Sequence, residues 1–205
     1  MKTQFATIIA AVALLVSTNI TNAKADNGAV ELPKVGSINK IEASGNVDVY
    51  LVNGDYDAVK VYDNYYSGNA VVQNEDGVLR IASYAADKLV VFVTVNDLKA
   101  ITANDNASVR SYGDAFSAKG IDITLNDQAV AQLKIDAVGA TITVNDQARA
   151  EFAGSIENYE LNYTAAATVK KDNLQSRASR EKQIVQPKSI RTYATAFGIN
   201  AGLLN

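Results

Sequence analysis

The sequence contains two nearly identical stretches, "ITLNDQAVA" (123–131) and "ITVNDQARA" (142–150), and a related stretch, "ITANDNASV" (101–109), precedes them. A fourth copy, "LNYTAAATV" (161–169), has Thr164 and Ala165 where the others have Asn-Asp. Alignment of the copies places aliphatic residues in one column at intervals of 22, 19 and 19 residues: Ile101, Ile123, Ile142 and Leu161. Repetition at a nearly fixed interval indicates a stacked array of one structural unit.

Each copy has the two-residue period of a half-buried β-strand. In the copy that begins at Ile123, residues Leu125 and Leu133 lie on the same side as Ile123, and Thr124 and Gln132 lie on the other. The Asn-Asp pair interrupts this alternation. Asn and Asp bond to nearby backbone and tolerate unusual backbone angles, so the pair predicts a corner between two strands.

The interval predicts the architecture. Three short strands joined by three corners use roughly 20 residues, which is one coil of a parallel β-helix whose coils stack about 4.8 Å apart. We therefore expect an all-β, single-domain parallel β-helix with about 19–22 residues per coil. An antiparallel sandwich is the alternative, although it does not explain why identical residues recur in register. Stacked coils would place the corner residues in two ladders: Asn104, Asn126 and Asn145, and Asp105, Asp127 and Asp146.

The regular array occupies only the middle of the chain. Upstream segments such as "NVDVYLVNG" and "LVVFVTVND" keep the strand chemistry but lose the period, so we expect irregular first coils. From about Leu174 the repeat stops and basic residues accumulate. The resulting division is a linker at 26–36, a β-helix domain at 37–173 and a C-terminal cap or mobile basic tail at 174–205. Residues 174–185 have a weak helical pattern, and a final strand is the alternative for the remainder.

The N-terminal segment has the layout of a secretory signal peptide. Lys2 precedes an apolar run from Phe5 to Val16, and Ala23-Lys24-Ala25 is a small-x-small cleavage site. We expect residues 1–25 to be removed, with an uncleaved anchor helix as the alternative. No later stretch is long and apolar enough to span a bilayer. The predicted location is outside the cytoplasm: periplasm, cell surface or extracellular space.

Composition argues against several kinds of activity. The 205 residues include no His and no Cys, which removes common zinc ligands and the usual general base. The net charge is −3, and the basic residues concentrate near the end of the chain, so the body is acidic. An acidic body argues against a nucleic acid as partner. We expect no cofactor and no metal.

In their order along the chain, "IEASGNVDVYLVNG", "VKVYDN", "GVLRIAS", "LKAITANDNASV" and the "ITLNDQA" repeats resemble the head GIN domain family, whose members are exported proteins described as "putative auto-transporter adhesins". The resemblance covers roughly residues 37–170. It implies a right-handed parallel β-helix, shaped like pectin lyases but without their catalytic residues, and a function in adhesion. Many members have Gly or Ser-Gly at the position of Asn-Asp, so the resemblance does not make the ladders a family site.

Two groups of residues are candidate sites. Three tyrosines that lie close together offer apolar faces with polar tips, suited to a sugar ring or a protein: Tyr62, Tyr65 and Tyr66. The alternative is that these rings belong to the core. The stacked Asp carboxylates offer oxygen ligands to calcium, but corner chemistry explains them more simply.

We expect a non-catalytic exported binding protein that contacts a glycan or a surface protein through one face of the β-helix. A structural envelope protein that self-associates is the alternative. A degenerate polysaccharide-active enzyme is the third hypothesis, but Lys134 and Arg149 alternate with polar residues as solvent-facing side chains do. No Ser-His, Cys-His or closely spaced carboxylate pair stands out in the sequence.

Overall fold

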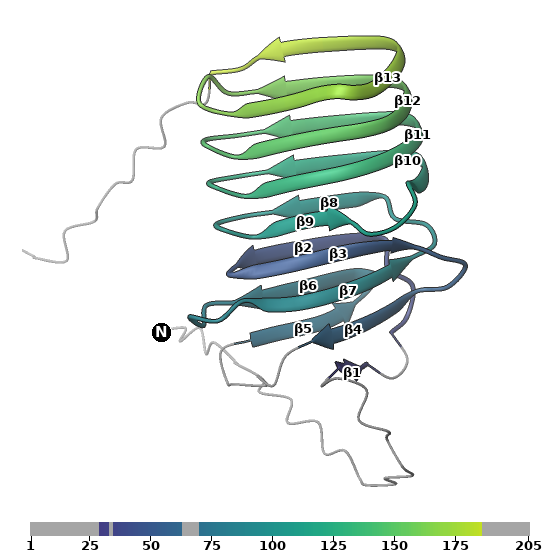
Figure 1. The fold of residues 1–205 in the computed structure, drawn as a ribbon, viewed down its shortest axis with the longest axis vertical. Coiled ribbons are helices and arrows are strands. Elements are labelled where there is room, and N and C mark those ends of the chain that lie inside the picture. Colours follow the sequence, from purple (N-terminus) through teal and green to yellow (C-terminus); the bar gives the residue numbers. More distant parts are fainter. Residues whose placement is uncertain (1–28, 33–34, 63–69, 186–205) are drawn as a thin grey trace, which may run out of the picture.

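The computed structural model describes residues 29–32, 35–62 and 70–185, and every regular element in this part of the chain is a β-strand (Figure 1). The predicted signal peptide (1–25), Tyr65, Tyr66 and the chain beyond Val185 lie outside the described residues. Within those residues there is no helix long and apolar enough to cross a membrane.

The first nine strands along the chain are short, and the last four are longer. The first seven are β1 (Ala29–Glu31), β2 (Lys40–Gly45), β3 (Val47–Asn53), β4 (Ala58–Tyr62), β5 (Ala70–Glu75), β6 (Val78–Ser83) and β7 (Leu89–Val95). The repeat region supplies β8 (Ala100–Ala103), β9 (Ser108–Ser111), β10 (Phe116–Leu125), β11 (Val130–Val144), β12 (Arg149–Tyr163) and β13 (Thr168–Gln183).

Alternation of apolar and polar residues determines which side of each strand faces the core. In β3, Val47, Val49 and Leu51 are buried while Asp48 and Tyr50 point to the other side. The same two-residue pattern repeats in β7 and β11. Inward side chains from every strand except β1, β5 and β13 join in one apolar core, which is mostly Ile, Val, Leu and Ala with two Phe and one Tyr. Burial of this continuous core provides the main driving force for folding.

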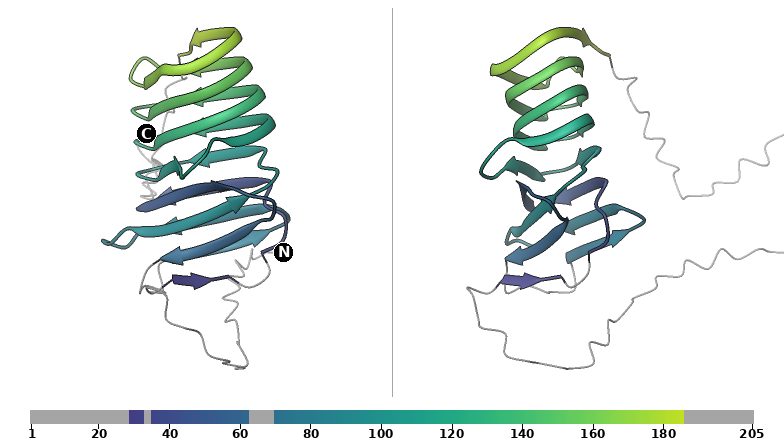
Figure 2. Two further views of the ribbon diagram at one scale, coloured as in Figure 1. Left: turned by 45° about the vertical axis from the view of Figure 1, so that its right-hand side comes forward. Right: turned by 90° about the vertical axis from the view of Figure 1, so that its right-hand side faces the viewer.

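All thirteen strands belong to one curled sheet that contains both parallel and antiparallel pairs (Figures 1 and 2). Its main path runs β1-β4-β7-β3-β9-β11-β10-β8-β2-β6-β5, and β12 and β13 continue from β11. The path goes up one side of the molecule and down the other, because β11 pairs with β9 through its first residues and with β10 through most of its length. The sheet thereby encloses the core between its two sides.

The predicted right-handed parallel β-helix is wrong. Strands β1 and β4, β4 and β7, and β5 and β6 pair antiparallel. Moreover, β2 lies between β6 and β8, and β3 lies between β7 and β9, so the order along the sheet is not the order along the chain. The architecture is a mixed, curled sheet in the form of a half-barrel. The antiparallel sandwich is not observed either, since there is one sheet instead of two.

The physical reason for the error is that a two-residue period reports which side of a strand is buried and carries no information about the direction of its neighbours. The turn at Asp76-Gly77 illustrates this. Both residues have left-handed backbone angles, with φ values of 51° and 81°, and they join β5 to β6 in an antiparallel hairpin. The chain reverses there instead of turning a corner.

The repeats themselves lie in the register that their alignment predicts. Ile123 is directly opposite Ile101 on one neighbour and Ile142 on the other, and Ile142 is opposite Leu161. All three pairings are parallel, and the four side chains are at most 2% exposed. The equivalent residues of successive repeats therefore stack on one another.

The C-terminal end of the described chain is also extended. Residues 174–183, for which the sequence suggested a weak helix, belong to β13, which pairs in parallel with β12. Only Val169 and Leu174 of this strand pack against the core. The other edge of β13 has no neighbouring strand among the described residues. Most side chains of β13 are exposed, and many of them are charged.

Gly154 occupies a position in β12 that requires glycine. Its φ is +102°, and a Cβ placed on it would lie 2.3 Å from the carbonyl oxygen of Ile135 on β11. The irregularity follows the register shift between Glu151 and Ala153, where β12 meets β13. A side chain here would both strain the backbone and push two strands apart.

We expect Gly154→Ala to lower the free energy of unfolding by about 2 kcal/mol, since it combines an unfavourable backbone conformation with a steric clash. Gly139→Ala is the matched control. Gly139 lies in the adjacent strand, its φ is not positive, and an added Cβ would meet nothing closer than 4.0 Å. Urea denaturation measures both. Equal midpoints for the two variants would contradict the assignment of strain to Gly154.

Candidate functional site

The Asn-Asp corners form tight turns with one left-handed residue each. Asp105, Asp127 and Asp146 have φ values of 56°, 58° and 53°. Each turn closes when the amide of the following Ala donates to the carbonyl of the preceding Asn, as Ala129 does to Asn126 at 3.0 Å. Asp and Asn tolerate the left-handed region better than other side chains.

Hydrogen bonds between successive corners connect them in ladders. The Asn126 amide donates to the Asn104 side-chain oxygen at 2.7 Å, and the Asn145 amide donates to Asn126 at 2.8 Å. The backbone amide of Asp105 donates to the carboxylate of Asp127 at 3.2 Å, and a matching bond joins the next pair. These carboxylates therefore hold one corner to the next.

The ladders have a clear end. Thr164 replaces Asn in the fourth copy, and its hydroxyl donates to the carbonyl of Asp146 instead. The Oδ1 atom of Asn145 consequently has no hydrogen-bond partner in the described part of the chain, although it is buried. As for the calcium alternative, the described residues contain no group of three acidic, His or Cys side chains arranged to hold a metal ion. What the structure shows of the ladders is a set of hydrogen bonds between successive corners.

An aromatic cluster lies on the outer face of the sheet and includes one of the predicted tyrosines. Tyr62 of β4 packs edge-on against Phe92 of β7, with ring centroids 5.0 Å apart. Phe92 stacks on Tyr50 of β3 at 4.8 Å, and both contact Tyr112, which follows β9. We name these four residues the aromatic face. Tyr112 is 57% exposed and Tyr62 is 37% exposed, so the cluster presents rings to solvent.

Charged groups border the aromatic face. Lys60 is directly opposite Phe92 and Arg110 is directly opposite Tyr50 in the sheet. Arg110 and Lys88 both contact the carboxylate of Asp48, at 3.3 and 2.7 Å. Such pairs fix the side chains more than they stabilise the fold. The border supplies hydrogen-bond donors next to an apolar surface, which is the combination found in many ligand sites.

Sequence reasoning identified only part of this cluster. It selected the run that contains Tyr62, and the structure describes neither Tyr65 nor Tyr66. Phe92 and Tyr112 were missed because they are 30 and 50 residues further along the chain. The signal that could have found Phe92 is the alternation of β7, in which Leu89, Val91, Val93 and Val95 face inward and leave the ring on the outer side.

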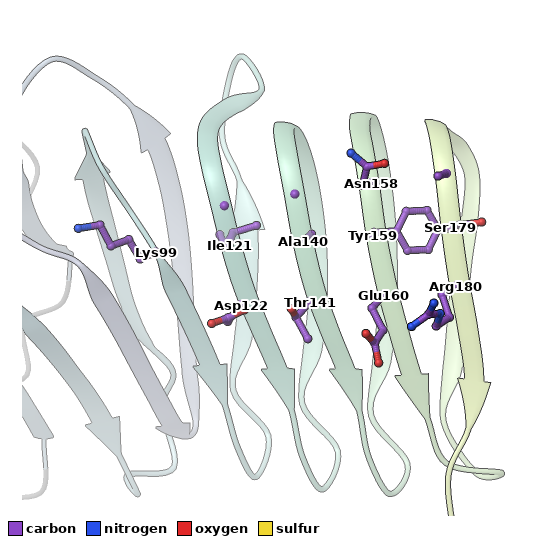
Figure 3. A pocket seen from close by; sticks show the side chains of 13 residues that line it. Lys99, Ile121, Asp122, Ala140, Thr141, Asn158, Tyr159, Glu160, Ser179 and Arg180 are labelled. Atoms are coloured by element: carbon purple, nitrogen blue, oxygen red, sulfur yellow. The ribbon is translucent and has the colours of Figure 1, made fainter.

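A second candidate site lies across the repeats. It is a groove of about 720 Å³ on β10 to β13, where these strands bend between the two sides of the sheet (Figure 3). Asp122, Thr141 and Glu160 lie in one row on successive strands, and Asn158 lies on the other border. Gly120, Gly139 and Ala140 line it with little side-chain volume. The remaining lining residues are Lys99, Ile121, Tyr159, Ala178, Ser179 and Arg180.

Beside the groove, Tyr159 connects β12 to β13. Its ring is 8% exposed, and its hydroxyl donates to the carboxylate of Glu181 at 2.9 Å. The Lys171 ammonium forms an ion pair with the same carboxylate. Hydrogen bonds from Lys171 and Tyr159 hold the pKa of Glu181 below its ordinary value.

The two basic residues considered for catalysis do not converge. Lys134 of β11 is opposite Ala153, and Arg149 of β12 is opposite Val130, so the two are separated by four residues along the paired strands. Both are exposed. They do not form a common site.

Comparison with known proteins agrees with the family resemblance. Residues 37–180 match the family described as "Putative auto-transporter adhesin, head GIN domain". Similar folds occur in crystal structures, each described as a "putative adhesin", from Bacteroides fragilis (TM-score 0.66, 15% identity, 76% of this chain and 75% of that chain) and Parabacteroides merdae (0.59, 15%, 76% and 76%). A third is from Parabacteroides distasonis (0.56, 16%, 76% and 77%). Among curated proteins, none matches the chain.

We expect Asn126→Ala to lower the free energy of unfolding by about 2–4 kcal/mol, because it leaves the Asn104 oxygen and the Asn145 amide without partners. Gln128→Ala, two residues away at an exposed position of the same turn, is the control and should change stability by less than about 0.5 kcal/mol. Thermal and urea unfolding measure both. Similar losses in the two variants would show that the ladder contributes nothing specific.

Stability should also depend on pH through Glu181. Its pKa is lower in the folded protein than in the unfolded chain, so its contribution is present above the unfolded pKa and disappears as pH falls through the folded pKa. We expect Glu181→Gln to reduce the loss of Tm between about pH 5 and pH 3. Glu157→Gln, at an exposed position of β12, serves as the control. An unchanged pH profile in Glu181→Gln would refute this role.

Proposed function

Because the chain belongs to the head GIN domain family, whose description names an adhesin, we propose that it is an exported, non-catalytic binding protein of the adhesin type. Its place of action would be the periplasm, the cell surface or the extracellular space. The similar crystal structures share 15–16% identity with the chain and support the fold alone.

The aromatic face is the contact surface in this proposal, and a glycan is its ligand. The observation that carries it is the packing of Tyr50, Tyr62, Phe92 and Tyr112 from four separate segments into one outward-facing cluster. Aromatic rings on the outer face lower the solubility of the protein and add nothing to its core. Binding of a ligand therefore explains their presence better than a contribution to folding does. Tyrosine offers an apolar ring and a hydroxyl, which match the apolar faces and the hydroxyls of a sugar.

Polar groups at the border would orient the ligand. The Arg110 guanidinium retains N–H groups beyond those that contact Asp48 and Gln132, and Lys60 lies on the opposite border. Because the rings pack against one another and the charges are paired, these side chains would lose little conformational freedom on binding. That reduces the entropic cost of association.

Self-association as a structural envelope protein is the second candidate. The observation in its favour is the long β13, which has a neighbouring strand on one side only among the described residues. Against it stand the charges on this strand, including Lys170, Lys171, Arg177 and Lys182, since charged side chains are a common means of preventing edge-to-edge pairing. Sedimentation over a wide concentration range distinguishes the two candidates.

We expect the purified protein to bind components of a broad glycan array, and Tyr112→Ala and Tyr62→Ala each to weaken binding about tenfold or more. Tyr56→Ala is the control, because Tyr56 is 71% exposed but is not part of the cluster. A blank array, or an equal loss in the Tyr56 variant, would overturn the glycan proposal and direct the search to protein partners.

A further inference from the structure

We propose that the groove across β10 to β13 is a second binding site, separate from the aromatic face, and that it takes a neutral oligosaccharide lying across the strands (Figure 3). The proposal relies on the proposed function only for the class of ligand. Its residues come from the repeats, whereas the aromatic face is built by β3, β4, β7 and the residue after β9.

The dimensions of the groove suit an extended chain molecule. It crosses four neighbouring parallel strands, and strands lie about 4.8 Å apart, so its length is roughly 15–20 Å. Its borders are two residues apart along each strand, which is about 6.6 Å. A hollow of this shape accommodates a single chain of sugar rings that lies perpendicular to the strands.

The glycines in the groove have no structural requirement that explains them. Neither Gly120 nor Gly139 has a positive φ. A Cβ on Gly120 would meet no atom within 4 Å, and one on Gly139 would come no closer than 4.0 Å to the carbonyl of Asn158. Glycine in the interior of a strand weakens the strand. One reason for a glycine at such a position is that a side chain there would occupy the space of a bound molecule. Their effect in this fold is to keep the hollow open.

The side chains of the groove match hydroxyl groups. Asp122 and Glu160 accept hydrogen bonds, Arg180 donates them, and Asn158 does both. Charge-assisted bonds of this kind are shorter and stronger than neutral ones. The lining contains two cations, Lys99 and Arg180, and two anions, so the charges cancel and a neutral ligand is favoured over an ionic one.

Two of these charged groups are available in the described part of the chain. Asp122 and Arg180 form no ion pair with any described residue, and Glu160 accepts one bond, from Asn162 at 3.3 Å. A peptide ligand is less suited to the groove. Inside the groove the strands are paired with each other, so a peptide that lay across them could not pair with their backbone as a further strand.

The test is a titration of the ¹⁵N-labelled protein with four neutral hexasaccharides: β-1,4-glucan, β-1,4-mannan, β-1,4-xylan and N-acetylglucosamine oligomers. We expect saturable amide shifts at Gly120, Gly139 and Thr141 with at least one of them. Gly139→Val should weaken binding at least tenfold by filling the hollow, while its Tm stays equal or rises, because a β-branched residue suits a strand. Ser155→Val, at an exposed position of β12 outside the groove, is the control.

A second variant tests the chemistry without adding volume. Glu160→Gln should weaken binding several-fold and leave Tm unchanged, and Tyr112→Ala should leave binding in the groove unaffected. Four blank titrations, or binding that survives Gly139→Val, would overturn this proposal. If Tyr112→Ala abolishes oligosaccharide binding and Gly139→Val does not, the aromatic face is the only glycan site of the two and the proposed function stands without the groove.

Discussion

The parallel, in-register pairing of the repeats is the constraint on which the rest of this structure depends. Because Ile123 lies opposite Ile101 and Ile142, each repeat presents the same side chain at the same place as its neighbour. Inside the protein, this register produces an unbroken column of aliphatic side chains. At the corners, it produces a line of Asn side chains that hydrogen-bond to one another. The open groove and its row of polar residues arise from the same register. A fold without disulfides gains its cohesion from this repetition of short contacts.

The two outer surfaces arise from different parts of the sheet and differ in character. The irregular N-terminal strands bring together residues from distant positions, and the aromatic face is possible only because β7 lies between β3 and β4. The surface of the repeat region is built differently, because each strand contributes one residue from the equivalent position of its repeat. If both proposed sites bind glycans, one rigid body would hold a glycan-covered surface more firmly than either site alone, since binding at one site raises the effective concentration at the other.

The sequence predicted the all-β class, the inward residues and the stacking of the repeats, because period two and the recurrence of "NDQA" are local signals. The course of the chain through the sheet was not predictable in this way. Insertion of β2 and β3 between β6–β7 and β8–β9 depends on long-range pairing, and the antiparallel β4 and β5 have the same alternation as parallel strands. Tyr62 was predicted to be a site residue from its neighbours in sequence, whereas Phe92 and Tyr112 pack near it only through the tertiary fold.

The side-chain oxygen of Asn145, which has no partner among the described residues, suggests how a protein built from such repeats can change in length. The side-chain oxygen of each corner Asn accepts a hydrogen bond from the Asn amide of the next corner, so one further repeat could bond in the same way. The series ends at Thr164, whose hydroxyl bonds to the carbonyl of Asp146 and leaves the Asn145 oxygen without a partner. Gain or loss of one whole repeat would leave the cross-section of the core and the bonding at both ends as they are. Gene duplication of about twenty codons would therefore alter the reach of the molecule in steps of one strand spacing, with no need to redesign its interior.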